Sequence, residues 1–292
     1  MTTAAVPGAD FDYCATVFGD QDLIARNRRS WAAVRMRRCL ESLADVTGQV
    51  LEVGCGAGRC IRTIRHHRPD LAACGCDLSQ SAIDAARRHR DGVVYQRADA
   101  AELPYADQTF DAVVVMDLIE HVPDVPAVLA EIRRVCKPGG RLHLHVPCEG
   151  SWLSVYRPLL MLGIDLTQAA VGHLQHLTRR QVLEHLASAG FVVTRRRYSM
   201  YFFGQVHDLI TWWSMLRPGG KGIAGAAPAG RGEAAPAPVP TSRRFRFKHL
   251  LTRPLWWAIR RSMPGLQYLE LAALSWQPLG SVGLCVTARR GS

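Results

Sequence analysis

The feature that most constrains the fold is an alternation of short apolar runs with helical stretches between Gln49 and Pro147. The apolar runs, in chain order, are QVLEVG, LAACGCD, VVYQRAD, FDAVVVMD and RLHLHVP. Helical stretches follow the first, the second and the fourth of them. Because such runs alternate with helices, they indicate a parallel sheet covered on both faces. We predict a doubly wound, Rossmann-like α/β fold, in which ligands bind at the carboxyl ends of the strands.

A further helix and two further strands are predicted toward the C-terminus. Thr178 can cap the helix, with Gln181 three residues later as in a capping box, and Gly190 can end it. The stretch FVVTRRRYS after Gly190 and the stretch SVGLCVTARR at 281–290 indicate strands. An insertion of helical character therefore separates the last strand from the rest of the core.

These elements divide the chain into four predicted parts. They are an N-terminal helical cap (1–44), a cofactor-binding core (45–200), a basic amphipathic insertion (201–280), and a final core strand with a tail (281–292). Within the insertion, residues 218–240 are rich in Gly, Ala and Pro, so they are predicted to form a disordered linker.

The basic surplus of the chain lies in its last third. Residues 1–199 hold 24 Lys and Arg against 22 Asp and Glu, a net charge of +2, whereas residues 200–292 hold 12 against 3, a net charge of +9. The pairs Trp212-Trp213 and Trp256-Trp257 lie in this basic part. Such segments can lie in an anionic membrane interface, or can stack on single-stranded nucleic acid. They can also form a cap that buries the aromatic rings. Their high aliphatic content favours lipid or a hydrophobic substrate.

The sequence also bears on location. The first thirty residues contain acids and no continuous apolar run, so no secretory signal peptide is predicted. No eighteen consecutive residues are apolar, which argues against a membrane-spanning helix. The nine cysteines include no CxxC pair and are interpreted as reduced thiols. We expect a cytoplasmic protein, on the inner face of the membrane if the basic part binds lipid.

A glycine turn follows the first predicted strand. It contains Gly54, Gly56 and Gly58, with Glu52 two residues before its first glycine. Glycines let the backbone turn tightly and approach a ligand closely. Asp77, nineteen residues after Gly58, ends the second strand, where a carboxylate can accept both hydroxyls of a ribose.

Two more strand ends continue this series. Asp99-Ala100 ends the third strand, within reach of an adenine amino group, and Met116 ends the fourth, where it can line the cofactor floor. Each acid could instead only cap the following helix. Four strand ends that agree in order favour a cofactor site.

These residues resemble the class I S-adenosylmethionine-dependent methyltransferases, and within them the ubiquinone and menaquinone biosynthesis type. The similar segments are LEVGCGAG, CDLSQSAIDAAR, ADAAELPYADQTFDAVVVMDLIEHV and EIRRVCKPGGRLHLHVP. The resemblance implies a seven-stranded sheet whose last strand is antiparallel. It also implies that S-adenosylmethionine is held by Glu52, Gly54, Gly56, Gly58, Asp77, Leu78, Asp99, Ala100 and Met116.

Methyl transfer requires alignment of an acceptor atom with the methyl group, and a hydroxyl acceptor also benefits from a general base. His145 lies two residues from His143, and we expect one of them to face the site while the other packs. His173 and His176 lie on a segment expected to cover the substrate. His121 follows the fourth strand. The catalytic candidates that we select are His145, His173 and His176.

The run from Asp117 to His121 resembles the D/E-x-x-E-H run of the ubiquinone-pathway O-methyltransferases, in which two acids and the histidine are associated with a divalent ion. Asp117, Glu120 and His121 would then bind a metal that orients a phenolate as a Lewis acid. In the alternative interpretation, Glu120 and His121 pack behind the cofactor without a metal.

Together these features predict a methyltransferase that acts on a small, hydrophobic or lipid-linked acceptor, with O-methylation favoured. One rival is a nucleic-acid or protein methyltransferase, but the N/D-P-P-Y/F motif that suits a flipped base is absent, since the fourth strand ends in VVVMDLIEHV. The other rival is a cofactor-binding partner subunit without activity, against which the intact acid series argues.

Overall fold

The computed structural model describes residues 17–25, 30–215, 262–263 and 265–291. In this part of the chain, seven strands form one sheet. They are β1 (Gln49–Val53), β2 (Ala72–Asp77), β3 (Val94–Arg97), β4 (Phe110–Met116), β5 (Cys136–Pro147), β6 (Phe191–Ser199) and β7 (Gly283–Arg290).

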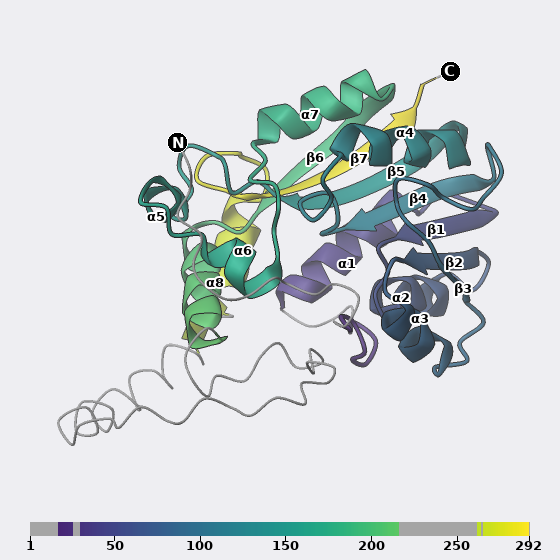
Figure 1. Cartoon of the computed structure of the whole chain (residues 1–292), viewed down its shortest axis with the longest axis horizontal. Coiled ribbons are helices and arrows are strands. Elements are labelled where there is room, and N and C mark those ends of the chain that lie inside the picture. The colour runs from purple at the N-terminus through teal and green to yellow at the C-terminus, as the bar shows by residue number, and fades with distance from the viewer. Residues whose placement is uncertain (1–16, 26–29, 216–261, 264, 292) are drawn as a thin grey trace, which may run out of the picture.

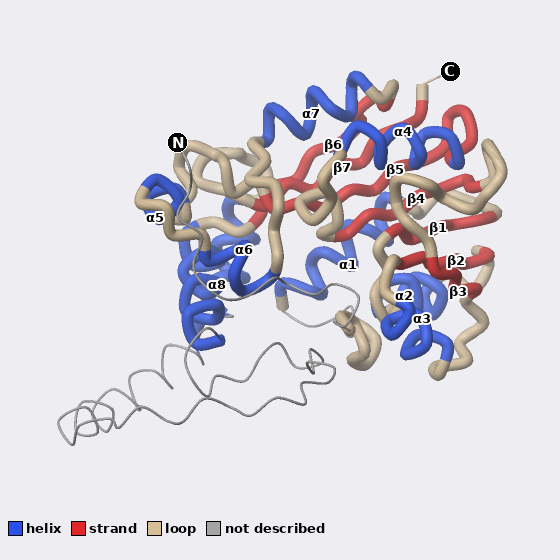
Figure 2. Tube along the Cα trace, viewed as in Figure 1, coloured by secondary structure: helices blue, strands red, loops and turns tan. Residues whose placement is uncertain are grey.

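The strand order in the sheet is β3-β2-β1-β4-β5-β7-β6 (Figures 1 and 2). The first five strands pair in parallel, and β7 runs antiparallel to both β5 and β6. The predicted seven-stranded sheet with an antiparallel last strand is therefore confirmed. Strand order reverses between β1 and β4, and at such a switch point the carboxyl ends of parallel strands leave a crevice for a ligand.

Eight helices with defined bounds accompany the described part of the sheet. They are α1 (Trp31–Ser42), α2 (Arg59–His67), α3 (Gln80–Arg87), α4 (Val125–Val135), α5 (Arg157–Met161), α6 (Leu166–Val171), α7 (Arg179–Ser188) and α8 (Phe202–Met215). Residues 265–274 are also helical. Figure 1 shows α5, α6 and α8 gathered beyond one end of the strands, away from α2 and α3.

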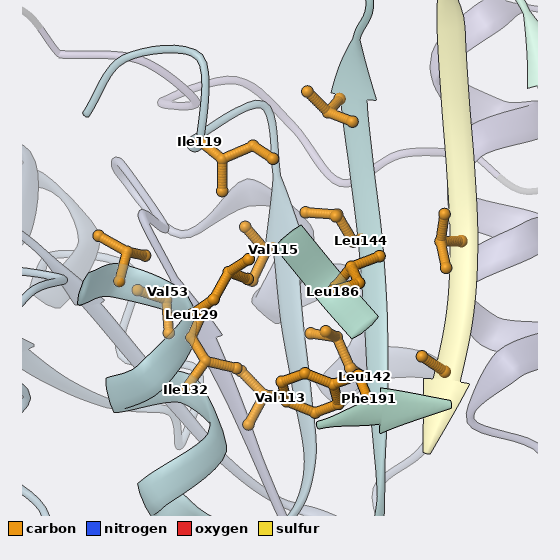
Figure 3. Packing of buried hydrophobic residues seen from close by; sticks show 14 of the residues in the cluster. Val53, Val113, Val115, Ile119, Leu129, Ile132, Leu142, Leu144, Leu186 and Phe191 are labelled. Carbon is orange, nitrogen blue, oxygen red and sulfur yellow. The ribbon is translucent and has the colours of Figure 1, made fainter. Parts of the chain in front are cut away.

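Two apolar layers bury the faces of the sheet. On one face, α4 and α7 pack against alternate residues of the central strands, such as Val113, Val115 and Leu144 (Figure 3). On the other face, α1, α2 and α3 cover the intervening residues, such as Val114. Because successive side chains of a strand point to opposite faces, strands covered on both sides are apolar throughout. This explains the uninterrupted run of apolar residues in β4.

The capping box predicted at Thr178 is present. The Thr178 hydroxyl accepts a hydrogen bond from the Gln181 backbone N–H (3.2 Å), and the Gln181 side chain accepts one from the Thr178 N–H (2.9 Å). Gly190, with a φ of +75°, follows the helix as predicted. The chain then enters β6 directly, so α7 is held against the sheet edge that β6 forms.

The C-terminal insertion is described in part. Trp212 of α8 is buried and packs with Tyr156 and Val282, so this tryptophan belongs to a cap over the core and not to a membrane-facing surface. The predicted linker 218–240 and the pair Trp256-Trp257 lie outside the described residues. None of the helices in the described residues has the length and apolar character needed to span a bilayer.

Candidate functional site

A cavity of about 770 Å³ opens at the carboxyl ends of the parallel strands. Its walls come from the turn after β1, the loops after β2 and β3, the ends of β4 and β5, and helices α1 and α8. Its volume lies in the range of small-molecule and cofactor pockets. One continuous space thus spans the switch point of the sheet and the helical cap.

The glycine turn forms one wall of the cavity at Gly54 and Gly56, as predicted. A Cβ on Gly54 would lie 2.9 Å from the Leu118 side chain, and a Cβ on Gly56 would lie 2.5 Å from the Phe18 carbonyl oxygen. Both residues have positive φ, at +74° and +53°. Neither position can therefore accept a side chain without displacing its neighbours.

Gly58, expected to bind the cofactor, does not line the cavity. It is buried, its φ is +82°, and a Cβ there would lie 2.5 Å from the Tyr95 hydroxyl. This glycine is required where α2 begins close against β3. Its conformation is needed for this packing, and a direct contact with the cofactor stays a prediction.

The other predicted cofactor residues all line the cavity: Glu52, Gly54, Gly56, Asp77, Leu78, Asp99, Ala100 and Met116. Asp77 also supports the turn, since its carboxylate accepts the N–H of Gly56 (2.7 Å) and that of Ser79 (2.9 Å). Asp99 accepts the N–H of Ala101 (2.9 Å) and is exposed. Neither acid caps a helix, since Ser79 is the N-cap of α3 and no helix lies between β3 and β4, a stretch that the structure describes throughout.

Glu52 is the buried acid of the turn, with 2% of its surface exposed. Its carboxylate accepts the N–H of Ile61 in the first turn of α2 (2.8 Å). Burial raises the pKa of Glu52 to about 8, against the lowering effect of this hydrogen bond and one from Cys60. In the cofactor-free protein Glu52 is therefore mainly neutral at pH 7.

Arg35 of α1 is a cavity residue that no sequence motif indicates. Its guanidinium forms an ion pair with Asp117, and its Nε, although buried, has no hydrogen-bond partner among the described residues. The guanidinium also lies 5.5 Å from the centroid of the Trp31 ring. Arg35 lies on α1, before the first motif in the sequence. No motif or spacing there could have marked it as a residue of the site.

Asp117 is held by Arg35 and by His145, whose Nδ1 lies 2.6 Å from Oδ1 of Asp117. Burial alone would raise the pKa of Asp117, but the Arg35 guanidinium and the His145 imidazole outweigh it and hold this pKa below its usual range. Burial and the charge of Arg35 lower the pKa of His145 to about 4. Asp117 is thus an ionised partner of a neutral histidine.

His143 and His145 point to the same face of β5, because strand side chains alternate with a period of two. Only His145 reaches the cavity, since it lies nearer the carboxyl end. His143 lies deeper, with its Nε2 3.7 Å from the Cys285 sulfur. As expected, one of the two histidines, His145, faces the cavity, and the other, His143, packs in the interior.

Glu120, His121 and His173 meet at the wall of the cavity. Three of their polar atoms, one from each residue, all lie within 4.8 Å of one another. Glu120 is fully buried, and neither of its carboxyl oxygens has a hydrogen-bond partner among the described residues. Burial, then the charge of Asp117, raise the pKa of Glu120 well above its usual value.

The metal set predicted from the sequence therefore does not form as expected. Asp117 is turned toward Arg35 and His145, and His173 takes its place beside Glu120 and His121. His173 is brought there because the Glu120 backbone carbonyl accepts the N–H groups of Leu174 (2.9 Å) and Gln175 (3.0 Å). The spacing of Asp117 to His121 could not show this contact.

His176 does not line the cavity. Its Nε2 lies 3.2 Å from the Asp165 carboxylate and 2.9 Å from the Thr167 hydroxyl. The hydrogen bond with Asp165 raises the pKa of His176. Of the three histidines selected as catalytic candidates, the structure brings His145 and His173 to the cavity and leaves His176 behind its wall.

The cavity also has apolar walls. They include the Trp31 and Trp212 rings and the side chains of Val171 and Met200. Polar atoms at one point, surrounded by aromatic and aliphatic side chains, are typical of a site for an organic ligand with one reactive polar group.

The raised pKa of Glu52 leads to a prediction about stability in the cofactor-free protein. The stability that neutral Glu52 contributes is fully present below the ordinary glutamate pKa of 4.5 and is lost as the pH rises through about 8. Glu52→Gln cannot ionise. Between about pH 5 and pH 8 its free energy of unfolding should therefore gain on that of the wild type, by on the order of a few kcal/mol.

Denaturant unfolding at several pH values checks this expectation. Glu102→Gln, which changes an exposed carboxyl, serves as the control and should follow the wild type. Parallel curves for Glu52→Gln and the wild type would show that Glu52 is ionised in the folded protein.

Part of the chain is similar in sequence to known proteins. Residues 51–144 match the family model described as a methyltransferase domain. The chain is 38% identical over 139 residues to the ubiquinone/menaquinone biosynthesis C-methyltransferase UbiE of Desulfotalea psychrophila, which covers 46% of this chain and 56% of that protein. It is 33% identical over 113 residues to the ubiquinone biosynthesis O-methyltransferase of Coxiella burnetii, covering 37% and 47%. The chain thus spans about half the length of the curated relatives it matches.

Solved structures show the same fold. The [4+2]-cyclase SpnF superposes with a TM-score of 0.55 at 20% identity, covering 95% of this chain and 88% of that protein. Phosphoethanolamine N-methyltransferase 2 of Haemonchus contortus, solved with S-adenosyl-L-methionine, gives a TM-score of 0.52 at 16% identity and covers 89% and 52%. At these identities the likeness concerns the fold alone.

Proposed function

We propose that this chain, which carries a class I methyltransferase domain of the ubiquinone and menaquinone type, transfers a methyl group from S-adenosylmethionine to a hydroxyl of a small hydrophobic or lipid-like acceptor. The observation that carries the proposal is the single cavity. It is lined both by the predicted cofactor residues other than Gly58 and by Glu120, His121 and His173 together with aromatic and aliphatic side chains, which we assign to the acceptor.

The described residues fit the cofactor. The turn at Gly54 and Gly56 has no room for side chains, so only backbone faces the ligand there, and Asp77 and Asp99 offer carboxylates along the same edge. We assign Arg35 to the cofactor carboxylate, since a guanidinium matches a carboxylate and its Nε is still unpaired. When bound, S-adenosylmethionine supplies an electrophilic methyl group on a sulfonium.

The acceptor end supports a hydroxyl on an apolar body. Trp31, Val171, Met200 and Trp212 can surround a ring or chain. The relatives act, by their names, in ubiquinone and menaquinone biosynthesis, one as a C-methyltransferase and one as an O-methyltransferase. We favour oxygen as the acceptor atom because histidines line the cavity beside these side chains. A hydroxyl acceptor benefits from such a general base.

The first prediction of this proposal concerns cofactor binding. Asp77→Ala removes the carboxylate meant for the ribose and also releases the N–H of Gly56. Hydrogen bonds to charged groups contribute about 1.5–3 kcal/mol, so S-adenosylhomocysteine should bind about 10-fold to 100-fold more weakly by calorimetry. Asp70→Ala, the same change in the exposed loop that precedes β2, is the control and should bind like the wild type.

Turnover tests the rest of the proposal. An organic extract of a strain that lacks this protein is incubated with the purified chain and S-adenosylmethionine, and mass spectrometry follows which compound gains a methyl group. The wild type should methylate an apolar compound and Asp77→Ala should not. Methylation of nucleic acid or protein alone, or no transfer with any fraction, would overturn the assignment.

A divalent ion is a separate question. The predicted set of Asp117, Glu120 and His121 lacks Asp117, whose carboxylate is held by Arg35 and His145. We therefore expect methyl transfer to persist in excess chelator once metal analysis shows a metal-free protein. Loss of activity that Mg²⁺ restores in the wild type but not in Glu120→Gln would instead establish a metal at the group formed with His173.

The partner that we propose is an anionic membrane surface. Four large apolar side chains lie exposed on one segment near α5, namely Trp152 (78%), Leu153 (53%), Met161 (78%) and Leu162 (74%). Arg157 lies 4.9 Å from the centroid of the Trp152 ring. Together with the net charge of +9 on residues 200–292, these side chains suit an interface of headgroups and acyl chains.

Vesicle co-sedimentation tests this partner. The wild type should sediment with phosphatidylglycerol vesicles and less so as salt rises, because the attraction of basic residues falls off within a Debye length. The double variant Met161→Ser, Leu162→Ser should lose the binding that remains at high salt, whereas Val94→Ser, on the opposite edge strand, should not. A wild type that stays in solution at low salt, yet binds a single-stranded oligonucleotide, would favour base stacking instead.

A further inference from the structure

Glu149 is a buried carboxyl that no motif indicated. It follows β5, lines the cavity, and has 2% of its surface exposed. Its Oε2 lies 3.0 Å from Nδ1 of His173 and 3.9 Å from Nε2 of His176. The hydrogen bond from the Gly150 N–H to the Leu177 carbonyl (3.2 Å) joins the two segments beside this contact.

We propose that Glu149 is the positioning residue of a general base, that it fixes His173 with the proton on Nδ1, and that the bare Nε2 of His173 receives the acceptor hydroxyl. This inference rests on the proposed function and assigns the base within the same site. It makes Glu149 and His173 a pair of the kind in which a carboxylate orients an imidazole.

Oε2 of Glu149 faces two imidazoles, with Nδ1 of His173 at 3.0 Å and Nε2 of His176 at 3.9 Å. A carboxylate can only accept hydrogen bonds, so Nδ1 of His173 is the donor in the pair that we propose. His176, first considered as a base, is held by Asp165 behind the cavity wall.

One nitrogen of His173 lies within 4.8 Å of a carboxyl oxygen of Glu120 and of a nitrogen of His121. We assign Nε2 to this position, because Nδ1 faces Glu149. A single atom among three polar atoms at such separations can be within about 2.8 Å of each, the length of an ordinary hydrogen bond. A hydroxyl oxygen there can donate to His173 and pair with the carboxyl of Glu120, which has no hydrogen-bond partner in the described residues.

The electrostatic surroundings favour His173 over His145 as the base. A base must carry a positive charge once it has taken a proton. His173 contacts Glu149, whereas His145 shares Asp117 with the permanently charged Arg35, which opposes a second positive charge. His145 is therefore suited to hold Asp117, and His173 to accept the proton.

The step balances as a displacement. The acceptor oxygen forms a bond to the methyl carbon as the carbon–sulfur bond breaks, and the bonding pair stays on sulfur, which becomes the neutral thioether of S-adenosylhomocysteine. The hydroxyl proton moves to Nε2 of His173, and the resulting imidazolium is stabilised by Glu149 until water takes the proton.

Nitrogen NMR of protein labelled with [¹⁵N]histidine tests the pair without any acceptor. His173→Gln identifies the His173 signals. In the wild type near neutral pH we expect a protonated Nδ1 and a bare Nε2. In Glu149→Leu the proton should shift toward Nε2, while Glu184→Leu, the same change at an exposed site on α7, should leave the spectrum of His173 unchanged.

Two further readouts separate this inference from a structural role and from the proposed function. Glu149→Leu should bind S-adenosylhomocysteine like the wild type by calorimetry, yet methylate the strain extract at least about 100-fold more slowly, as expected for loss of general-base catalysis. A protonated Nε2 on His173 in the wild type would overturn the inference even if Glu149→Leu does not fold. Absence of transfer by the wild type would overturn the proposed function and leave the tautomer result standing.

Discussion

The site depends on the close approach of backbone segments at the turn after β1. A side chain at Gly54, Gly56 or Gly58 would collide with Leu118, Phe18 or Tyr95, respectively. The N–H groups of Gly54 and Cys55 both donate to the Cys76 carbonyl (2.8 and 2.9 Å), and Asp77 accepts the N–H of Gly56. The turn is thus tied to β2. This turn leaves a crevice at the switch point between β1 and β4, and the other residues of the cavity line that crevice.

Three carboxyl groups at this opening differ in charge because their surroundings differ. Glu52 and Glu120 are buried without a cation in contact, so their pKa values rise. Asp117 is half-buried beside Arg35 and His145, and these two outweigh burial and hold its pKa low. The pair of Arg35 and Asp117 joins α1 to the end of β4, so α1 forms a wall of the cavity.

The sequence was sufficient for features that depend on local pattern. Alternating apolar runs predicted the doubly wound sheet, the Thr178–Gln181 spacing predicted a capping box, and the acids after successive strands predicted Asp77 and Asp99 at one edge. The glycine pattern could not show that Gly58 packs against Tyr95, because it does not distinguish a turn facing a ligand from a turn facing a side chain.

Contacts between distant segments could not be predicted in this way. Arg35 and Asp117 are 82 residues apart, and Glu149 and His173 are 24 apart. His173 lies beside Glu120 because the Glu120 carbonyl accepts the N–H groups of Leu174 and Gln175. A hydrogen bond between distant backbone segments leaves no periodic pattern in the sequence. The sequence could not show for the same reason that Asp117 pairs with Arg35 of α1, apart from the group of Glu120, His121 and His173.

The central claim is that one cavity has a cofactor end and an acceptor end that act separately. A paired measurement on His173→Gln tests it most directly: the affinity for S-adenosylhomocysteine by calorimetry, and the rate of methyl transfer to the strain extract. The account predicts an affinity equal to that of the wild type together with a rate reduced about 100-fold or more. Weakened cofactor affinity, or a full rate of transfer, would contradict it.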